Sequence, residues 1–111
     1  SLSNIYRPQV YKLLNNLLEW EKTYLKKEQL FEQEKQRLFS TGVKFLIFSI
    51  QNIKKGNLDR KREQEEVRNV LEQSMVRESI HNIDIFKYRW KMEILVLLSR
   101  CSCIKLLLRL L

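Results

Sequence analysis

Residues 8–39 read PQVYKLLNNLLEWEKTYLKKEQLFEQEKQRLF and contain no glycine and no second proline. Ser3 or Asn4 ahead of Pro8 indicates a helix start, because proline loses no hydrogen bond in a first helical turn. Charged residues fill most of the gaps between the apolar ones, which gives one apolar and one polar helix face. The stretch therefore predicts a long amphipathic helix over about 8–39. Its apolar residues recur every seven positions, at Val10, Leu17, Tyr24, Phe31 and Leu38.

A second line of positions seven residues apart in the same stretch becomes charged at Lys27 and Glu34. A two-stranded coiled coil needs two sustained apolar lines, so coiled-coil pairing is poorly specified here. The pattern favours packing of this helix against other helices.

The next segment, VKFLIFSI at residues 43–50, is apolar on all sides except at Lys44. Periodicity alone fits either a buried helix or a buried strand. Since no second strand is available to pair with it, we expect a helix over about 43–55, either after a break at residues 40–42 or continuous with the first helix. Lys54 and Lys55 suit a helix C-terminus, and Gly56 can adopt the left-handed cap that follows one.

Two further helices are expected, over about 58–81 and 85–111. Asn57 or Asp59 can cap the first of them, and Asp84 can cap the second. Two glycines and one proline in 111 residues are too few for a β-sandwich or barrel. The sequence thus predicts a single all-α domain over residues 1–111, with three or four helices arranged as a bundle or an extended hairpin.

Enzymatic chemistry has little support in this sequence. His81 is the only histidine, and there is no glycine-rich phosphate loop, no Gly-x-Ser-x-Gly motif and no His-x-x-x-His pair. Cys101 and Cys103 together with His81 fall short of the four ligands of a structural zinc site. We expect no catalytic residues, no metal and no cofactor.

The two cysteines also bear on the compartment. A disulfide between positions two apart is strained, so Cys101 and Cys103 are expected to be reduced thiols. The first residues show no secretory signal, and no apolar tract reaches about 18 uncharged residues. We expect an intracellular protein of the cytoplasm, nucleus or mitochondrion.

Basic residues outnumber acidic ones by 21 to 13, a formal net charge of +8. Five of them fall within nine residues at an expected interhelical turn, where clustered cations can neutralise phosphates. They are Lys54, Lys55, Arg60, Lys61 and Arg62. The chain could therefore bind RNA or DNA independently of base sequence.

A second basic run, FKYRWK at residues 86–91, interleaves aromatic and cationic side chains. In an extended conformation it would place three aromatics on one face, which suits stacking on single-stranded nucleic acid. In a helix, Phe86 and Trp90 would share a face, as core residues commonly do.

The helix expected at 58–81 has too few apolar residues to cover the apolar faces of the other expected helices. Uncovered apolar faces often mark protein interfaces. We expect a non-enzymatic helical interaction subunit of a larger assembly. Its partner is a protein or a second copy of the chain, with nucleic acid as the alternative and membrane-surface contact by the C-terminal segment as a lesser one. The expected partner-binding residues are Leu17, Tyr24, Phe31 and Leu38.

Two triplets near the expected first helix, Ile5-Tyr6-Arg7 and Val10-Tyr11-Lys12, resemble the Leu-Tyr-Arg motif of the small, basic, helical mitochondrial proteins of the LYR-motif family. The first triplet departs from the motif at one position and is followed by Pro8, where the family continues a helix. The second departs at two positions. The resemblance implies a role in respiratory-chain or iron–sulfur assembly, with an acyl-carrier protein as partner.

Overall fold

The computed structural model describes residues 5–111, which form helices joined by short turns and contain no strand. The all-α class is confirmed, with more helices than expected and the 3-10 turn η2 at Ile85–Lys87. The α-helices are α1 (Val10–Lys27), α2 (Phe31–Lys54), α3 (Arg60–Glu72), α4 (Ser74–Asn82), α5 (Trp90–Arg100) and α6 (Ile104–Leu110). The expected start signal at Ser3 or Asn4 lies outside the described residues.

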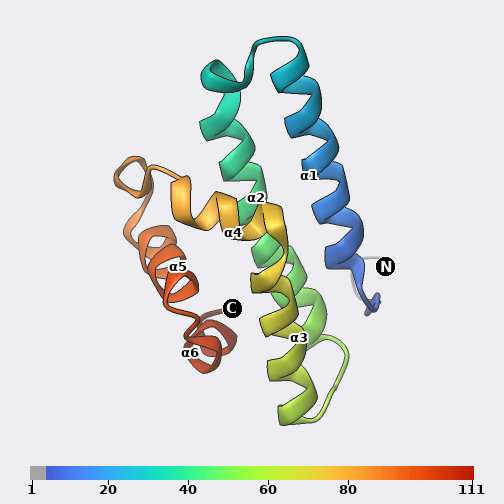
Figure 1. Ribbon diagram of the computed structural model, residues 1–111. Coiled ribbons are helices and arrows are strands. Elements are labelled where there is room, and N and C mark those ends of the chain that lie inside the picture. The colour runs from blue at the N-terminus through green and yellow to red at the C-terminus, as the bar shows by residue number, and fades with distance from the viewer. Residues whose placement is uncertain (1–4) are drawn as a thin grey trace.

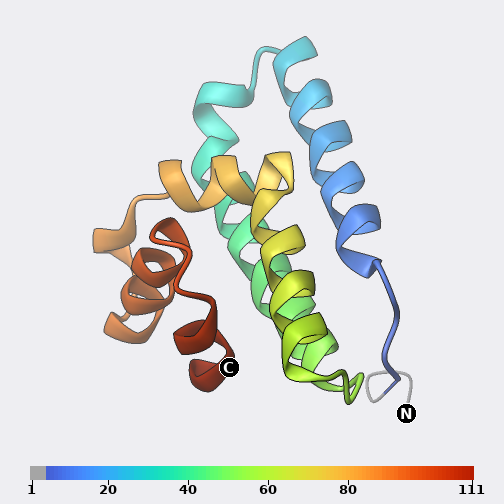
Figure 2. The same ribbon diagram turned by 60° about the horizontal axis from the view of Figure 1, so that its bottom comes forward.

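The helices are built around an antiparallel hairpin of α1 and α2 (Figure 1). The α3 helix returns beside α2, and α4 crosses α2 at a steep angle. In both views α5 and α6 lie on the side of α2 and α4 that faces away from α1 (Figure 2). The helix α1 therefore forms one side of the molecule, and α5 and α6 form the opposite side.

The prediction of one helix over 8–39 is wrong, because the chain reverses at residues 28–30. Gln29 adopts a left-handed conformation with φ of 59°, and the Leu30 N–H donates to the Leu25 carbonyl at 2.8 Å. The reversal brings α1 against α2 and α4, which a straight helix could not do. The residues that it buries together are Leu18, Leu25, Leu38 and Met75.

Of the two alternatives for residues 40–42, the break is wrong and the continuous helix is correct, since Gly42 lies inside α2. A Cβ atom at Gly42 would lie 2.0 Å from Ser79 Oγ and 2.5 Å from Ser79 Cβ. Glycine is needed here for the close crossing of α2 and α4 and not for a turn. Residues 43–50 continue α2, so their predicted helical state is confirmed.

Expectations for the turn between α2 and α3 are met in part. Asp59 caps α3 as predicted, accepting a hydrogen bond from the Arg62 N–H at 2.8 Å. Gly56 is not the left-handed residue, because Asn57 takes that conformation with φ of 50°. Gly56 instead leaves room for the Tyr6 ring, which would lie 3.1 Å from an added Cβ.

The helices expected over 58–81 and 85–111 are each interrupted. Gln73 is extended and separates α3 from α4, which turns α4 across α2 and carries Met75 into the cluster with Leu38. Asp84 caps only the short η2 turn, by accepting from the Phe86 N–H. Ser102, with φ of 54°, reverses the chain between α5 and α6.

A larger core joins all six α-helices, and Tyr11 of α1 is buried in it. Burial, reinforced by the nearby Glu66 carboxylate, raises the pKa of the Tyr11 phenol above its ordinary value. The other buried members are Phe39, Val43, Leu46, Ile50, Ile53, Val67, Val70, Leu71, Val76, Ile80, Ile83, Leu95, Val96 and Leu107.

Candidate functional site

The α1 helix is apolar on two faces. Its inner face is buried through Tyr11, Leu18 and Leu25. Four large apolar side chains on its outer face are 49–70% exposed, and they follow the i, i+4, i+7, i+11 spacing of one helix face. We call them the α1 surface: Leu13, Leu17, Trp20 and Tyr24. The Trp20 and Tyr24 rings stack, with centroids 6.1 Å apart and planes 13° from parallel.

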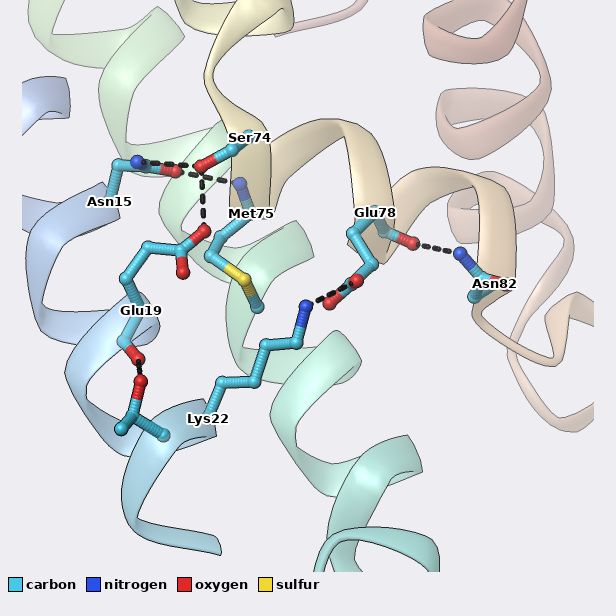
Figure 3. A network of polar contacts seen from close by, with 8 residues as sticks. Asn15, Glu19, Lys22, Ser74, Met75, Glu78 and Asn82 are labelled. Carbon is cyan, nitrogen blue, oxygen red and sulfur yellow. Dashed lines mark hydrogen bonds and ion pairs between the residues drawn. The ribbon is translucent and has the colours of Figure 1, made fainter. Parts of the chain in front are cut away.

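A polar network holds α1 against the start of α4 (Figure 3). Asn15 Oδ1 accepts from the Met75 N–H at 2.8 Å, and Asn15 Nδ2 donates to Ser74 Oγ at 3.2 Å. Ser74 Oγ in turn donates to Glu19 Oε1 at 2.7 Å. Because Gln73 offers α4 no side-chain cap, Asn15 satisfies one of its free N–H groups from a different helix.

A salt bridge adds a second link between the same helices. Lys22 Nζ lies 2.6 Å from Glu78 Oε1, and the two side chains are 21% and 29% exposed. The network and this salt bridge use the side of α1 that faces α4. The α1 surface is thus presented on a helix whose position and rotation are set by polar contacts to α4, of which the Asn15–Met75 hydrogen bond is buried.

The predicted partner-binding residues divide between surface and core. Leu17 and Tyr24 belong to the α1 surface. Phe31 is half-buried and meets Phe39 edge-to-face, with ring centroids 6.3 Å apart. Leu38 is 0% exposed, so its assignment to a binding surface is wrong: the hairpin places it in the core. The structure adds Leu13 and Trp20. They share the helix face of Leu17 and Tyr24 at 3.6 residues per turn, but they do not belong to the seven-residue repeat used to choose the predicted residues.

The five cations of the predicted basic turn are all exposed at the junction of α2 and α3. Lys54 Nζ donates to the Leu108 carbonyl at 2.9 Å, and Arg62 Nε lies 3.7 Å from Glu66 Oε1. The fold brings α6 to this turn and forms a cavity of about 350 Å³, here called the basic pocket. Its lining consists of Arg60, Glu63, Gln64, Lys105, Leu108 and Arg109.

The aromatic-basic run at residues 86–91 matches neither conformation considered for it. Phe86 lies in η2 and Trp90 begins α5, so the run is not an extended stacking platform. Phe86 is 87% exposed and Trp90 65% exposed, so they are not core residues either. Only Tyr88 packs against the larger core.

Within residues 5–111, no three His, Cys, Asp or Glu side chains gather into a possible metal site. His81 lies exposed in the last turn of α4, and Cys101 and Cys103 are free thiols. None of the helices described is long and apolar enough to span a bilayer. Comparison of the chain with protein-family models, curated proteins and solved structures gave no significant match.

Proposed function

We propose that this chain is a non-enzymatic interaction subunit that binds a helix of a partner protein through the α1 surface. The observation that carries the proposal is a continuous row of four large, exposed apolar side chains on a firmly held helix. Scattered exposed apolar residues are ordinary, but a contiguous row of this size is typical of an interaction site.

The shape and composition of the α1 surface favour a helix as the occupant. From Leu13 to Tyr24 the row is about 16 Å long at 1.5 Å per residue, or three turns of a partner helix. Trp20 and Tyr24 are the residue types that contribute most binding energy in protein interfaces. Asn16 and Lys27 border the row on one side and Glu28 on the other, which gives the polar rim of such an interface.

A photo-crosslinking residue in place of Trp20 is expected to trap one protein in the native cell. The same residue in place of Lys44, which is exposed on α2, is not expected to trap that protein. The trapped protein, once purified, should bind the wild-type chain and lose at least tenfold in affinity for the Leu17→Glu/Trp20→Glu variant, because each is a large contact residue. Calorimetric titration measures this loss, and circular dichroism checks that the variant is folded.

Phe48→Glu is the matched control, because Phe48 is a similarly exposed apolar residue on α2. Equal binding by the Leu17→Glu/Trp20→Glu variant would refute the α1 surface as the contact. If the trapped protein is a second copy of the chain, the surface serves self-association and the heterologous partner is wrong.

Nucleic-acid binding is the second candidate, and the basic pocket is the observation that favours it. Arg60 of the basic turn meets Lys105 and Arg109 of α6, which lie more than forty residues further along the chain. Converging cations of this kind can contact phosphates, and such contacts carry no sequence information. Lys54, Lys55, Lys61 and Arg62 extend the positive surface along the turn.

Replacing Arg60, Lys105 and Arg109 with glutamine should weaken binding of unrelated oligonucleotides. The slope of the logarithm of the binding constant against the logarithm of the salt concentration should become shallower by about two to three. Fluorescence anisotropy at several salt concentrations measures both effects. The control replaces Lys44, Arg68 and Arg77, which are exposed elsewhere, and so removes the same charge. Equal weakening by the two variants would show that net charge alone acts and that the basic pocket is no site.

The Leu-Tyr-Arg resemblance yields no separate proposal. The structure uses both tyrosines in packing, Tyr11 in the core and Tyr6 against Gly56.

A further inference from the structure

A second exposed apolar row lies on α5, on the side of the molecule opposite α1 (Figures 1 and 2). Trp90, Ile94 and Leu97 are 65%, 40% and 47% exposed and share one helix face at i, i+4 and i+7. Phe86, in the preceding η2 turn, is the most exposed large apolar side chain among the described residues. The opposite face of α5 is buried through Leu95 and Val96, so this row is additional to the core contact.

Cations accompany this row. Lys87, Arg89 and Lys91 are exposed between and beside the two aromatic residues, and Lys91 Nζ lies 5.7 Å from the centroid of the Trp90 ring. Residues 85–111 contain six basic side chains and one acidic side chain, a net charge of +5. The acidic residue, Glu93, is only half exposed, and Asp84, which precedes this segment, has its Oδ2 3.8 Å from Lys87 Nζ.

A separate apolar hollow lies on the inner side of α5, the side that carries Leu95. It has a volume of about 160 Å³ and lies between α5, α6 and α2, and its lining is apolar except for Lys91. Leu106 and Leu110 of α6 are exposed as well, at 49% and 42%. The hollow is lined by Ile47, Lys91, Met92, Leu95, Leu110 and Leu111.

We propose that this α5 surface, consisting of Phe86, Lys87, Arg89, Trp90, Lys91, Ile94 and Leu97, binds the surface of an anionic lipid bilayer. Tryptophan partitions to the boundary between headgroups and acyl chains, where its ring is buried and its N–H stays hydrated, and phenylalanine inserts its apolar ring at the same depth. Lysine and arginine beside them neutralise acidic headgroups. The helix α5 lies along the bilayer surface, with its apolar row inserted and its other face on the protein core.

Single-stranded nucleic acid shares the phosphate chemistry but fits the apolar part of this surface less well. Bases stack on flat aromatic faces and on guanidinium groups. Ile94 and Leu97 offer no such face, whereas both gain from insertion among acyl chains. Aliphatic side chains next to the aromatic ones therefore favour the bilayer.

The helices α1 and α5 lie on opposite sides of α2 and α4 (Figures 1 and 2), so we expect the α1 surface to stay in water when the α5 surface is on the membrane. The proposal does not depend on the partner proposed for α1. A chain that lacks such a partner would still bind the bilayer.

Sedimentation of the full chain with vesicles tests the proposal. We expect binding to phosphatidylcholine vesicles that contain 30% phosphatidylserine, and much weaker binding to phosphatidylcholine alone. The Lys87→Gln/Arg89→Gln/Lys91→Gln variant should bind the anionic vesicles roughly a hundredfold more weakly, since each charge contributes about fivefold. In a Trp20→Phe background, a blue shift of the Trp90 fluorescence should accompany binding, because the ring leaves water.

Matched apolar variants locate the contact. Trp90→Ser/Leu97→Ser should lose at least tenfold in vesicle binding, whereas Trp20→Ser/Leu17→Ser, the same exchanges on α1, should not. Circular dichroism shows whether each variant is folded. If Trp90→Ser/Leu97→Ser is unfolded, the vesicle binding of the Lys87→Gln/Arg89→Gln/Lys91→Gln variant tests the proposal instead. Equal binding to neutral vesicles, equal losses in both apolar variants or an unshifted Trp90 spectrum would refute the proposal. Tighter binding of an oligonucleotide that depends on the same residues would assign the surface to nucleic acid instead.

Discussion

Leu38→Ala is expected to lower the free energy of unfolding by about 3 kcal/mol, within the range of about 2–5 kcal/mol for a leucine removed from a packed core. Leu38 is 0% exposed and packs with Leu18, Leu25 and Met75, so truncation leaves a cavity where three helices meet. Leu17→Ala, on the same heptad line, should change stability by less than about 0.5 kcal/mol because Leu17 is half exposed.

Urea unfolding followed by far-ultraviolet circular dichroism measures both values. The urea dependence of the unfolding free energy should be the same for the two variants, so that their midpoints report stability directly. A Leu17→Ala loss as large as that of Leu38→Ala would mean that the whole heptad line is buried. That result would contradict the reversal at residues 28–30.

Gly42→Ala is expected to destabilise the fold by about 2 kcal/mol, although alanine is the better helix former by about 0.5–1 kcal/mol. The added Cβ would lie 2.0 Å from Ser79 Oγ and 2.5 Å from Ser79 Cβ. The helices α2 and α4 must therefore separate or shift, a typical cost of overpacking. Adding Ser79→Gly removes both atoms and should recover much of the loss.

The same urea experiment on the two single variants and the double variant gives the coupling between positions 42 and 79. Lys44→Ala, exposed on the same helix, is the control and should be close to neutral. A gain in stability for Gly42→Ala would show that helix propensity outweighs the contact and that α2 and α4 do not approach this closely.

The helical class could be predicted because its causes are local. Few glycines and prolines, apolar residues at helical spacing and the capping carboxylate of Asp59 act within a few residues of each other. The helical state of residues 43–50 followed from the lack of any strand partner. None of these inferences needed to know which helix packs against which.

Part of the candidate site was also within reach of the sequence. The heptad line included Leu17 and Tyr24, which do lie on the exposed face of α1. It also included Leu38, which is buried, and it passed over Trp20, which is exposed. A helix with apolar residues on two faces does not itself specify which face the rest of the chain will cover, because either burial gains similar free energy.

Three of the helix breaks were decided by the tertiary structure and not by local sequence. The chain reverses or bends at Gln29, Gln73 and Ser102, none of which is a strong turn former, while Gly42 remains inside a helix. A left-handed residue other than glycine costs about 1–2 kcal/mol, which is less than the gain from burying one or two leucines. Local sequence determined that this chain is helical. Burial of distant side chains against one another determined where these three breaks fall and which apolar faces stay in water.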